Sequence, residues 1–209
     1  MTQNIFEIKH PLVQHKLGFL RDENTRSDEF RRIVAELTKL IAYEATKDLS
    51  VSADKVKSPI ADANVERVDN PPVIVSVMRA GNGMLESMLT MFPFCSAGHI
   101  GIYRDKFINN TVEYYFKLPE GIKGKDILLL DPLLATGDTM LASLDRLKQY
   151  EVGKIKVLTL LSSHDGIEKV HHFHPDVEIY TLNAEEGLNE QGYLVPGLGD
   201  AGDRMFGTK

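Results

Sequence analysis

The alternation of buried strands with helices constrains the fold of this chain more than any other feature of its sequence. Continuous apolar runs recur between segments in which apolar residues stand three or four positions apart, as on one face of a helix. Strands that are apolar on both faces must be covered on both faces. The pattern therefore predicts an α/β fold with a mostly parallel central sheet flanked by helices. The expected strands span 71–77, 98–104, 111–116, 125–131, 154–163 and 176–182, and the expected helices 27–49, 82–92, 137–150 and 166–174.

The composition is that of an ordinary globular protein, with 43% hydrophobic and 26% charged residues. A length of 209 residues predicts one domain, 1–209, and a formal net charge of -6 argues against general nucleic-acid binding. The single cysteine, Cys95, excludes an intrachain disulfide and fits a reducing cytosol. No apolar run has the length of a signal peptide core or a membrane helix, so we expect a cytoplasmic protein with no membrane contact.

Two loops follow expected strands and lead into expected helices, which is where parallel α/β folds bind their ligands. The first, "MRAGNG", comes after 71–77, and the second, "DPLLATGDT", comes after "ILLL". In the second loop the backbone N–H groups of residues 135–139 can converge on one anion at a helix N-terminus. Thr136 and Thr139 can add hydroxyl donors, and Asp131 can accept hydrogen bonds from two neighbouring sugar hydroxyls. A carboxylate followed by a phosphate cradle suits a ribose 5-phosphate, although an acidic turn with an ordinary helix cap has the same composition.

The C-terminal stretch "VPGLGDAGDRMFGTK" contains Gly197, Gly199 and Gly202 at G-x-G-x-x-G spacing. A dinucleotide-binding turn needs a following helix and an acidic residue about 20 positions later, and only seven residues follow Gly202. The two remaining interpretations are a glycine-rich surface turn and a pocket in which a ligand approaches the backbone closely.

With these segments in place, the chain resembles the type I phosphoribosyltransferases through "LLLDPLLATGDT", the loop that binds phosphoribosyl pyrophosphate (PRPP). More narrowly, it resembles the uracil phosphoribosyltransferase family. That resemblance covers nearly the whole chain and includes "HPLVQHKLGFLR", "YEAT", "MRAGNGM", "GIYRD" and "QGYLVPGLGDAGDRMFGTK".

The resemblance implies the type I phosphoribosyltransferase fold, with a smaller hood region that holds the base pocket. It implies that uracil and PRPP are converted to UMP and pyrophosphate in pyrimidine salvage. The cofactor would be Mg²⁺, held mainly through PRPP and without a dedicated protein metal site. A homo-oligomer, at least a dimer, is expected, and GTP is a candidate activator because it activates some members.

The resemblance also implies roles for individual residues. Arg79, Arg104 and Asp200 are the expected catalytic residues. Arg79 and Arg104 would grip the pyrophosphate, and Asp200 would lie near the reacting sugar. We expect a non-proline cis peptide at or beside Arg79–Ala80, and a lid over residues 105–114. The expected PRPP-binding residues are Arg79, Ala80, Gly81, Arg104, Asp131, Pro132, Leu133, Leu134, Ala135, Thr136, Gly137, Asp138, Thr139 and Asp200. The expected uracil-binding residues are Leu194, Gly199, Asp200 and Ala201.

Three departures from the pattern of type I enzymes bear on the substrate and the metal. Many of those enzymes have two adjacent acids at the loop start, whereas this chain has Asp131 followed by Pro132. Ala135 stands where the hypoxanthine and guanine enzymes carry an aspartate, which argues against a purine substrate. Asp138 stands where uracil enzymes commonly have glycine, so its carboxylate should point away from a phosphate.

Two other functions stay open. One is an RNA-binding pyrimidine regulator on the same fold, which the acidic balance disfavours. The other is a phosphoribosyltransferase for another base, such as orotate. The carboxylate of orotate needs a cation near the pocket, where the terminal segment offers only Arg204 and Lys209. The acidic run "NAEEGLNE" is interpreted as an exposed loop.

Overall fold

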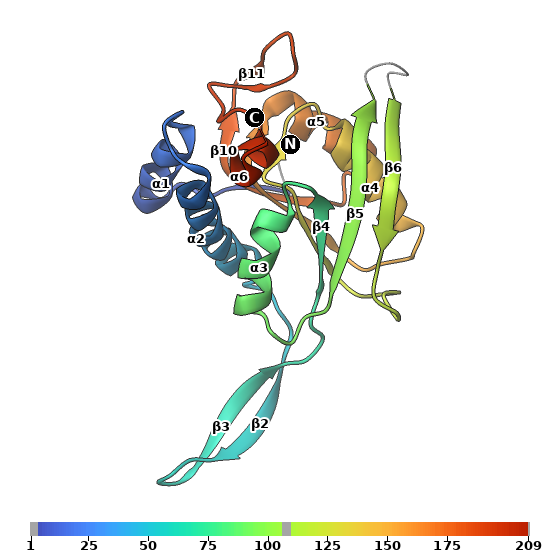
Figure 1. Ribbon diagram of the computed structural model, residues 1–209. Coiled ribbons are helices and arrows are strands. Elements are labelled where there is room, and N and C mark those ends of the chain that lie inside the picture. The colour runs from blue at the N-terminus through green and yellow to red at the C-terminus, as the bar shows by residue number, and fades with distance from the viewer. Residues whose placement is uncertain (1–3, 106–109, 209) are drawn as a thin grey trace.

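The computed structural model describes residues 4–105 and 110–208. Its main sheet has the strand order β1-β10-β9-β7-β4-β5-β6, with β8 paired to β9 (Figure 1). Every neighbouring pair in this sheet is parallel except β5 and β6. The strands are β1 (Ile5–Glu7), β4 (Val73–Met78), β5 (Ala97–Asp105), β6 (Asn110–Lys117), β7 (Ile127–Leu130), β8 (Leu133–Leu134), β9 (Ile155–Ser163) and β10 (Glu178–Glu185). The predicted α/β class and the mostly parallel sheet are therefore confirmed.

Helices cover both faces of this sheet because its strand residues alternate between two cores. In β4, Ile74 packs in the core that also contains buried residues of the first three helices and the last one, whereas Val75 packs in the core beneath α4 and α5. All nine residues of β9 are buried, as expected for a strand covered on both faces. The helices are α1 (Pro11–Arg21), α2 (Ser27–Ala45), α3 (Asn82–Met91), α4 (Asp138–Lys148), α5 (His164–Phe173) and α6 (Ala201–Phe206).

Helix α2 supplies the largest apolar stripe, as its periodicity predicts. Phe30, Leu37 and Ile41 have no exposed surface, and each such side chain contributes about 1.5–3 kcal/mol through burial. The same stripe contacts α3 and α6, so α2 links the first loop region to the C-terminal segment.

A small sheet of β11 (Gly187–Leu188) and β12 (Leu194–Val195) follows β10. Figure 1 shows this hood above the carboxyl ends of the central strands, close to α6. The hood and the last helix therefore lie over the edge of the sheet where ligands are expected.

Helix α1 and a two-stranded hairpin are the longest elements that lie outside the sequence-based expectations. Helix α1 begins at Pro11 after His10, whose Nδ1 accepts a hydrogen bond from the Leu12 amide at 3.1 Å. The hairpin of β2 (Val51–Lys57) and β3 (Asp62–Val68) is a separate two-stranded antiparallel sheet that projects from the body in Figure 1.

The interpretation of "NAEEGLNE" as an exposed loop is wrong in its first half. Residues 183–185 continue β10, and Glu185 is only 3% exposed. Parallel pairing with Ser163 extends the strand to this point. Glu186, Asn189 and Glu190 are exposed, as predicted.

Candidate active site

Three segments that are distant in sequence meet beyond the carboxyl ends of the central strands. The first follows β4, the second follows β7, and the third is the C-terminal segment that passes from β12 into α6. The spans 79–81, 131–139 and 194–203 contain the predicted site residues except Arg104. Arg104 lies on β5, but its side chain falls outside the described residues, as does much of the predicted lid.

The loop after β7 has the shape of an anion cradle. Gly137 takes a left-handed conformation with φ of 82° and leads directly into α4 at Asp138, the predicted helix start. The first amide groups of a helix have no acceptor within it, so they can donate to a ligand. Thr139 lies in this first turn, which brings its backbone N–H into the same group of donors.

The turn between β9 and α5 supports this cradle from behind. Ser163 Oγ donates to the carbonyl oxygen of Ala135 at 2.6 Å and accepts from the Gly166 amide at 2.8 Å. A Cβ atom on Gly166 would lie 2.3 Å from that same carbonyl oxygen. Only glycine therefore permits α5 to approach the loop this closely.

The Asp138 carboxylate is directed to a cation on α5. Its Oδ1 is paired with Lys169 Nζ, and its Oδ2 accepts from Thr136 Oγ1 at 3.0 Å. This agrees with the expectation that the carboxylate points away from a phosphate. In this structure the Thr136 hydroxyl donates to Asp138, so it is not directed to an anion on the loop.

Asp131 stands at the end of the fully buried strand β7 and is largely withdrawn from water. Burial raises the pKa of its carboxyl group to about 7, the Leu133 amide lowers the pKa by hydrogen bonding at 3.4 Å, and the charge of Asp200 raises it. Asp131 and Asp200 are therefore close enough to interact electrostatically.

The loop after β4 contains the predicted cis peptide, at Met78–Arg79. Gly81 is buried, and a Cβ atom there would lie 2.4 Å from the carbonyl oxygen of Leu130 at the end of β7. The Gly81 amide donates to the Val77 carbonyl at 2.8 Å, so this N–H is directed into the loop. The close packing of the two loops depends on this glycine.

The Arg79 guanidinium reaches the C-terminal segment. Its Nη2 lies 3.0 Å from Asp203 Oδ1 and its Nη1 lies 3.3 Å from Thr208 Oγ1. The Arg79 side chain is 54% exposed. A cation that is half exposed and already beside the third segment can exchange its partner for an anionic ligand.

The C-terminal segment borders a cavity of about 480 Å³. Gly199 is exposed with φ of +79°, and a Cβ atom there would make only an ordinary contact, 3.8 Å from Arg204 Cδ. Asp200 caps α6, because its Oδ1 accepts from the Asp203 amide at 2.8 Å, and Ala201 begins the helix. The cavity is lined by Asn189, Tyr193, Leu194, Val195, Pro196, Gly199, Asp200, Asp203 and Arg204.

Arg204 is anchored to backbone oxygen atoms. Its guanidinium donates to the carbonyl groups of Leu20, Asp22 and Leu198 and stacks 4.5 Å from the centre of the Phe30 ring. Burial lowers the pKa of this guanidinium. Of the two cations that could pair with the carboxylate of orotate, Arg204 is therefore engaged, and Lys209 lies outside the described residues.

The phosphate cradle and the C-terminal segment lie side by side. The Thr136 methyl group comes within 3.5 Å of the position of a Cβ atom on Gly192 in the hood, and a Cβ atom on Gly202 would lie 3.5 Å from Arg79 Nη2. A sugar phosphate on the cradle and a base beside the hood would thus be neighbours.

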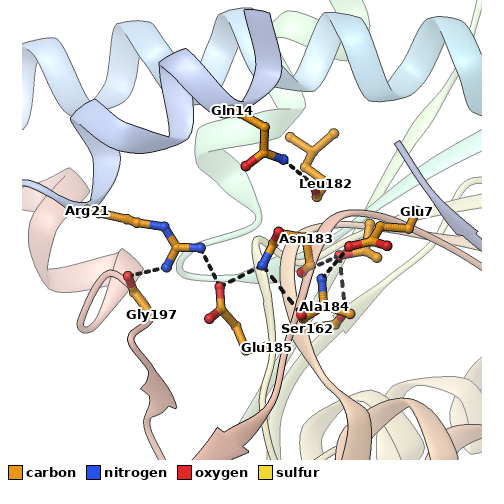
Figure 2. Close-up of polar contacts among 10 residues, drawn as sticks. Glu7, Gln14, Arg21, Ser162, Leu182, Asn183, Ala184, Glu185 and Gly197 are labelled. Atoms are coloured by element: carbon orange, nitrogen blue, oxygen red, sulfur yellow. Dashed lines mark hydrogen bonds and ion pairs between the residues drawn. The ribbon is translucent and has the colours of Figure 1, made fainter. Parts of the chain in front are cut away.

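Sequence reasoning missed four residues that organise these segments. Lys169 pairs with Asp138, Asp203 pairs with Arg79, and Arg21 pairs with Glu185, the pair drawn in Figure 2. Arg21 and Glu185 are 164 positions apart. Only the position of Glu185, near the carboxyl end of a buried strand, could have pointed to it from sequence.

Comparisons with known proteins agree with this arrangement. The family model of uracil phosphoribosyltransferase matches residues 7–208. A uracil phosphoribosyltransferase of Thermoanaerobacter sp. (strain X514) is 48% identical over 100% of both chains, and one of Polaromonas naphthalenivorans is 46% identical over 99% of both. A solved protein of Aquifex aeolicus is similar, with a TM-score of 0.91, 34% identity and 97% of each chain covered.

A more distant structure shares the fold. Adenine phosphoribosyltransferase of Trypanosoma brucei, solved in complex with AMP, pyrophosphate and ribose-5-phosphate, aligns with a TM-score of 0.60 at 14% identity, covering 92% of this chain and 88% of the other. At that identity the likeness establishes the type I phosphoribosyltransferase fold. On the family model and the full-length relatives together, the chain belongs to the uracil phosphoribosyltransferase family.

Proposed function

We propose that this protein transfers the phosphoribosyl group of PRPP to uracil, giving UMP and pyrophosphate. The observation that carries the proposal is that two segments lie next to each other. One is the β7–α4 cradle, which begins at Asp131, and the other is the glycine-rich C-terminal segment that contains Asp200. A carboxyl group and a ring of amides suit a ribose 5-phosphate, and an open backbone beside them suits a flat base. Membership of the family supports the same reaction.

The PRPP site uses the two loops that follow β4 and β7. The backbone N–H groups of residues 135–139 hold the 5-phosphate, and the Asp131 carboxylate accepts hydrogen bonds from the two ribose hydroxyls. Arg79 turns from Asp203 to the pyrophosphate, to which a guanidinium can donate two parallel hydrogen bonds. Arg104 is assigned to the same pyrophosphate on the basis of the family motif alone.

The uracil site uses main-chain atoms of the C-terminal segment. Uracil presents an acceptor, a donor and an acceptor along one edge. The N–H groups near Gly199 and Ala201 and the carbonyl group of Leu194 match them. Cytosine exchanges one acceptor and the donor on that edge, so it would leave buried backbone groups unpaired. Such a mismatch discriminates by about 10⁴-fold or more.

The carboxyl groups fit a magnesium ion that arrives with PRPP. Asp131 and Asp200 offer the hard oxygen ligands that Mg²⁺ prefers, and a nearby cation would offset their mutual repulsion. Among the described residues no group of three or more such side chains converges on one point. The ion would therefore be held mainly by oxygen atoms of PRPP, with Asp131 and Asp200 as the carboxyl groups that the chain could add. When bound, Mg²⁺ neutralises charge on the leaving pyrophosphate.

The bond between the anomeric carbon and pyrophosphate breaks with its electron pair leaving on pyrophosphate, and uracil N1 forms the new bond to that carbon. Arg79 and Arg104 stabilise the charge that develops on the leaving group. Asp131 and the cradle hold the sugar still, so positioning contributes much of the rate. Asp200 stabilises the cation-like ribosyl group or receives the N1 proton.

The remaining expectations extend this proposal. A homo-oligomer, a place in cytoplasmic pyrimidine salvage and activation by GTP stay predictions. No helix among the described residues is long and apolar enough to cross a membrane.

The proposal is tested by incubating the protein with PRPP, Mg²⁺ and one labelled nucleobase at a time. We expect a nucleotide from uracil and none from cytosine, orotate or hypoxanthine. A nucleotide formed only from another base would reassign the substrate. No product from any base, together with retention of pyrimidine-operon leader RNA in a gel-shift at moderate salt, would favour the regulator instead.

A further inference from the structure

An ion pair with a buried carboxylate contacts the C-terminal segment and involves no residue predicted to contact either substrate. Glu185 ends β10 and is 3% exposed, and its Oε1 lies 2.5 Å from Nη2 of Arg21, the last residue of α1 (Figure 2). Asn183 Nδ2 donates to the same carboxylate oxygen at 3.1 Å. A carboxylate removed from water requires such partners, so Glu185 fixes the position of the guanidinium.

The other arm of the Arg21 guanidinium holds the backbone of the C-terminal segment. Its Nη1 donates to the carbonyl oxygen of Gly197 at 2.9 Å (Figure 2). Arg21 thus makes a fork, with one donor on a fixed carboxylate and the other on a peptide group 176 positions away. A charge-assisted hydrogen bond of this kind is stronger than one between neutral groups.

Gly197 is in turn packed against the peptide group predicted to read the base. It is buried with φ of +58°, and a Cβ atom on it would lie 2.1 Å from the carbonyl oxygen of Leu194. The chain therefore folds back tightly from Leu194 to Gly197, and the placement of one peptide group sets the placement of the other. The next carbonyl group, that of Leu198, is held by Arg204 at 3.1 Å.

We propose that Arg21, oriented by Glu185, is a positioning residue for uracil binding. It fixes the Gly197 carbonyl and thereby the Leu194 carbonyl, which is predicted to accept from the base. The proposal rests on the proposed function, because it concerns the same base pocket. A pocket that binds its ligand with main-chain atoms has no side-chain rotamers to adjust. The placement of its hydrogen-bonding groups therefore depends on the contacts that hold the main chain.

The chemistry of the fork predicts which substitutions matter. Lysine at position 21 keeps the positive charge but is a single point of charge, so it cannot hold Glu185 and Gly197 in the same geometry. Glutamine at position 185 keeps the size of the side chain and removes the charge that orients Arg21. Both variants should loosen the segment while leaving the PRPP loops intact.

The test compares Arg21→Lys and Glu185→Gln with Glu178→Gln as a matched control. Glu178 lies at the opposite end of the same strand, near Lys156 and far from the hood. For each protein we would measure steady-state kinetics with varied uracil and with varied PRPP. PRPP binding without uracil and the midpoint of urea unfolding are measured as well. We expect KM for uracil to rise about tenfold or more in both test variants, the loss of one hydrogen bond to a charged group. The affinity of both test variants for PRPP should stay within about twofold of wild type, and so should the KM values of the Glu178→Gln control.

Two results would overturn the proposal. One is a folded Glu185→Gln or Arg21→Lys protein with unchanged KM for uracil. The other is a parallel loss of uracil and PRPP affinity, which is what a purely structural ion pair would give. If Glu185→Gln fails to fold, Arg21→Lys decides the question alone. A wild-type protein that makes no UMP would instead contradict the proposed function, and the wild-type arm reports that separately.

Discussion

The carboxyl group of Asp131, which follows the buried strand β7, is the proposed acceptor for the two ribose hydroxyls of PRPP. Asp131→Asn keeps the shape of the side chain but removes the charge that accepts from two ribose hydroxyls. Because hydrogen bonds to charged groups contribute about 1.5–3 kcal/mol, KM for PRPP should rise about tenfold to a hundredfold. Asp126→Asn is the matched control, since Asp126 precedes β7 at its other end and is exposed. Unaltered PRPP kinetics in Asp131→Asn would remove Asp131 from the site.

The same variant gives a pH-dependent readout of stability without any ligand. In the folded protein the pKa of Asp131 is about 7, above its usual value of 3.8, so the folded state binds this proton more tightly than the unfolded state. Through this group the stability of the wild type falls as pH rises from about 4 to about 7. Asp131→Asn lacks this loss, so its stability relative to wild type should increase by at most about 3 kcal/mol between pH 5 and pH 8. Urea unfolding at both pH values measures it, and a constant difference would mean that Asp131 is well hydrated.

At the residue scale, the sequence predicted which positions of the chain belong to the site better than it predicted which side chains pair with them. Asp131 was predicted because it follows a buried strand, a position visible in the order of residues, and Arg79 was predicted through the family resemblance. The partners Lys169, Glu185 and Arg21 were not predicted, because their importance arises only when segments 31 or 164 positions apart come together.

At the element scale, the phosphate cradle depends on how closely α5 approaches it. In Gly166→Ala the new methyl group would meet the Ala135 carbonyl oxygen at 2.3 Å and the Leu134 carbonyl oxygen at 3.1 Å. The loop must shift, so we expect weaker PRPP binding and a loss of about 1–3 kcal/mol of unfolding free energy from overpacking.

Gly18→Ala is the control for that substitution. Gly18 lies in α1 with nothing within 4 Å of a Cβ atom, so alanine should raise stability by about 0.5–1 kcal/mol and leave kinetics unchanged. Isothermal titration with PRPP and urea unfolding check both proteins. Normal PRPP affinity in Gly166→Ala would show that the cradle tolerates displacement of α5.

Most elements with a strong apolar pattern were predicted, although α1, with buried Val13, Leu17 and Leu20 at helical spacing, was not. Helix α2 and the strands β4, β7 and β9 carry continuous or periodic apolar residues that dictate burial. The β2–β3 hairpin has exposed and half-exposed residues throughout. Its pairing depends on backbone hydrogen bonds rather than on a buried face, so no periodicity signals it.

At the scale of the whole molecule, the sheet order explains why the site could be predicted only in part. Alternation of strands and helices implied a parallel sheet with ligands at the carboxyl ends of the strands. It did not imply that β1 would join the edge beside β10, or that the C-terminal segment would lie against the cradle. Those adjacencies follow from packing across the whole chain, and here the family resemblance supplied what local pattern could not.

The projecting hairpin bears on the predicted homo-oligomer. A two-stranded sheet is marginally stable alone in water, yet β2 and β3 pair along seven residues each, and Ile60 at the turn is 96% exposed. We expect a second copy of the chain to cover the hairpin, so the wild type should sediment as a dimer or larger. Replacing residues 52–67 with a short glycine-containing turn should give a monomer that keeps its circular dichroism and binds PRPP, because the cradle lies at the carboxyl ends of the central strands, away from the hairpin (Figure 1). A shortened protein that sediments like the wild type would place the subunit contact elsewhere, and a monomeric wild type would contradict the oligomer itself.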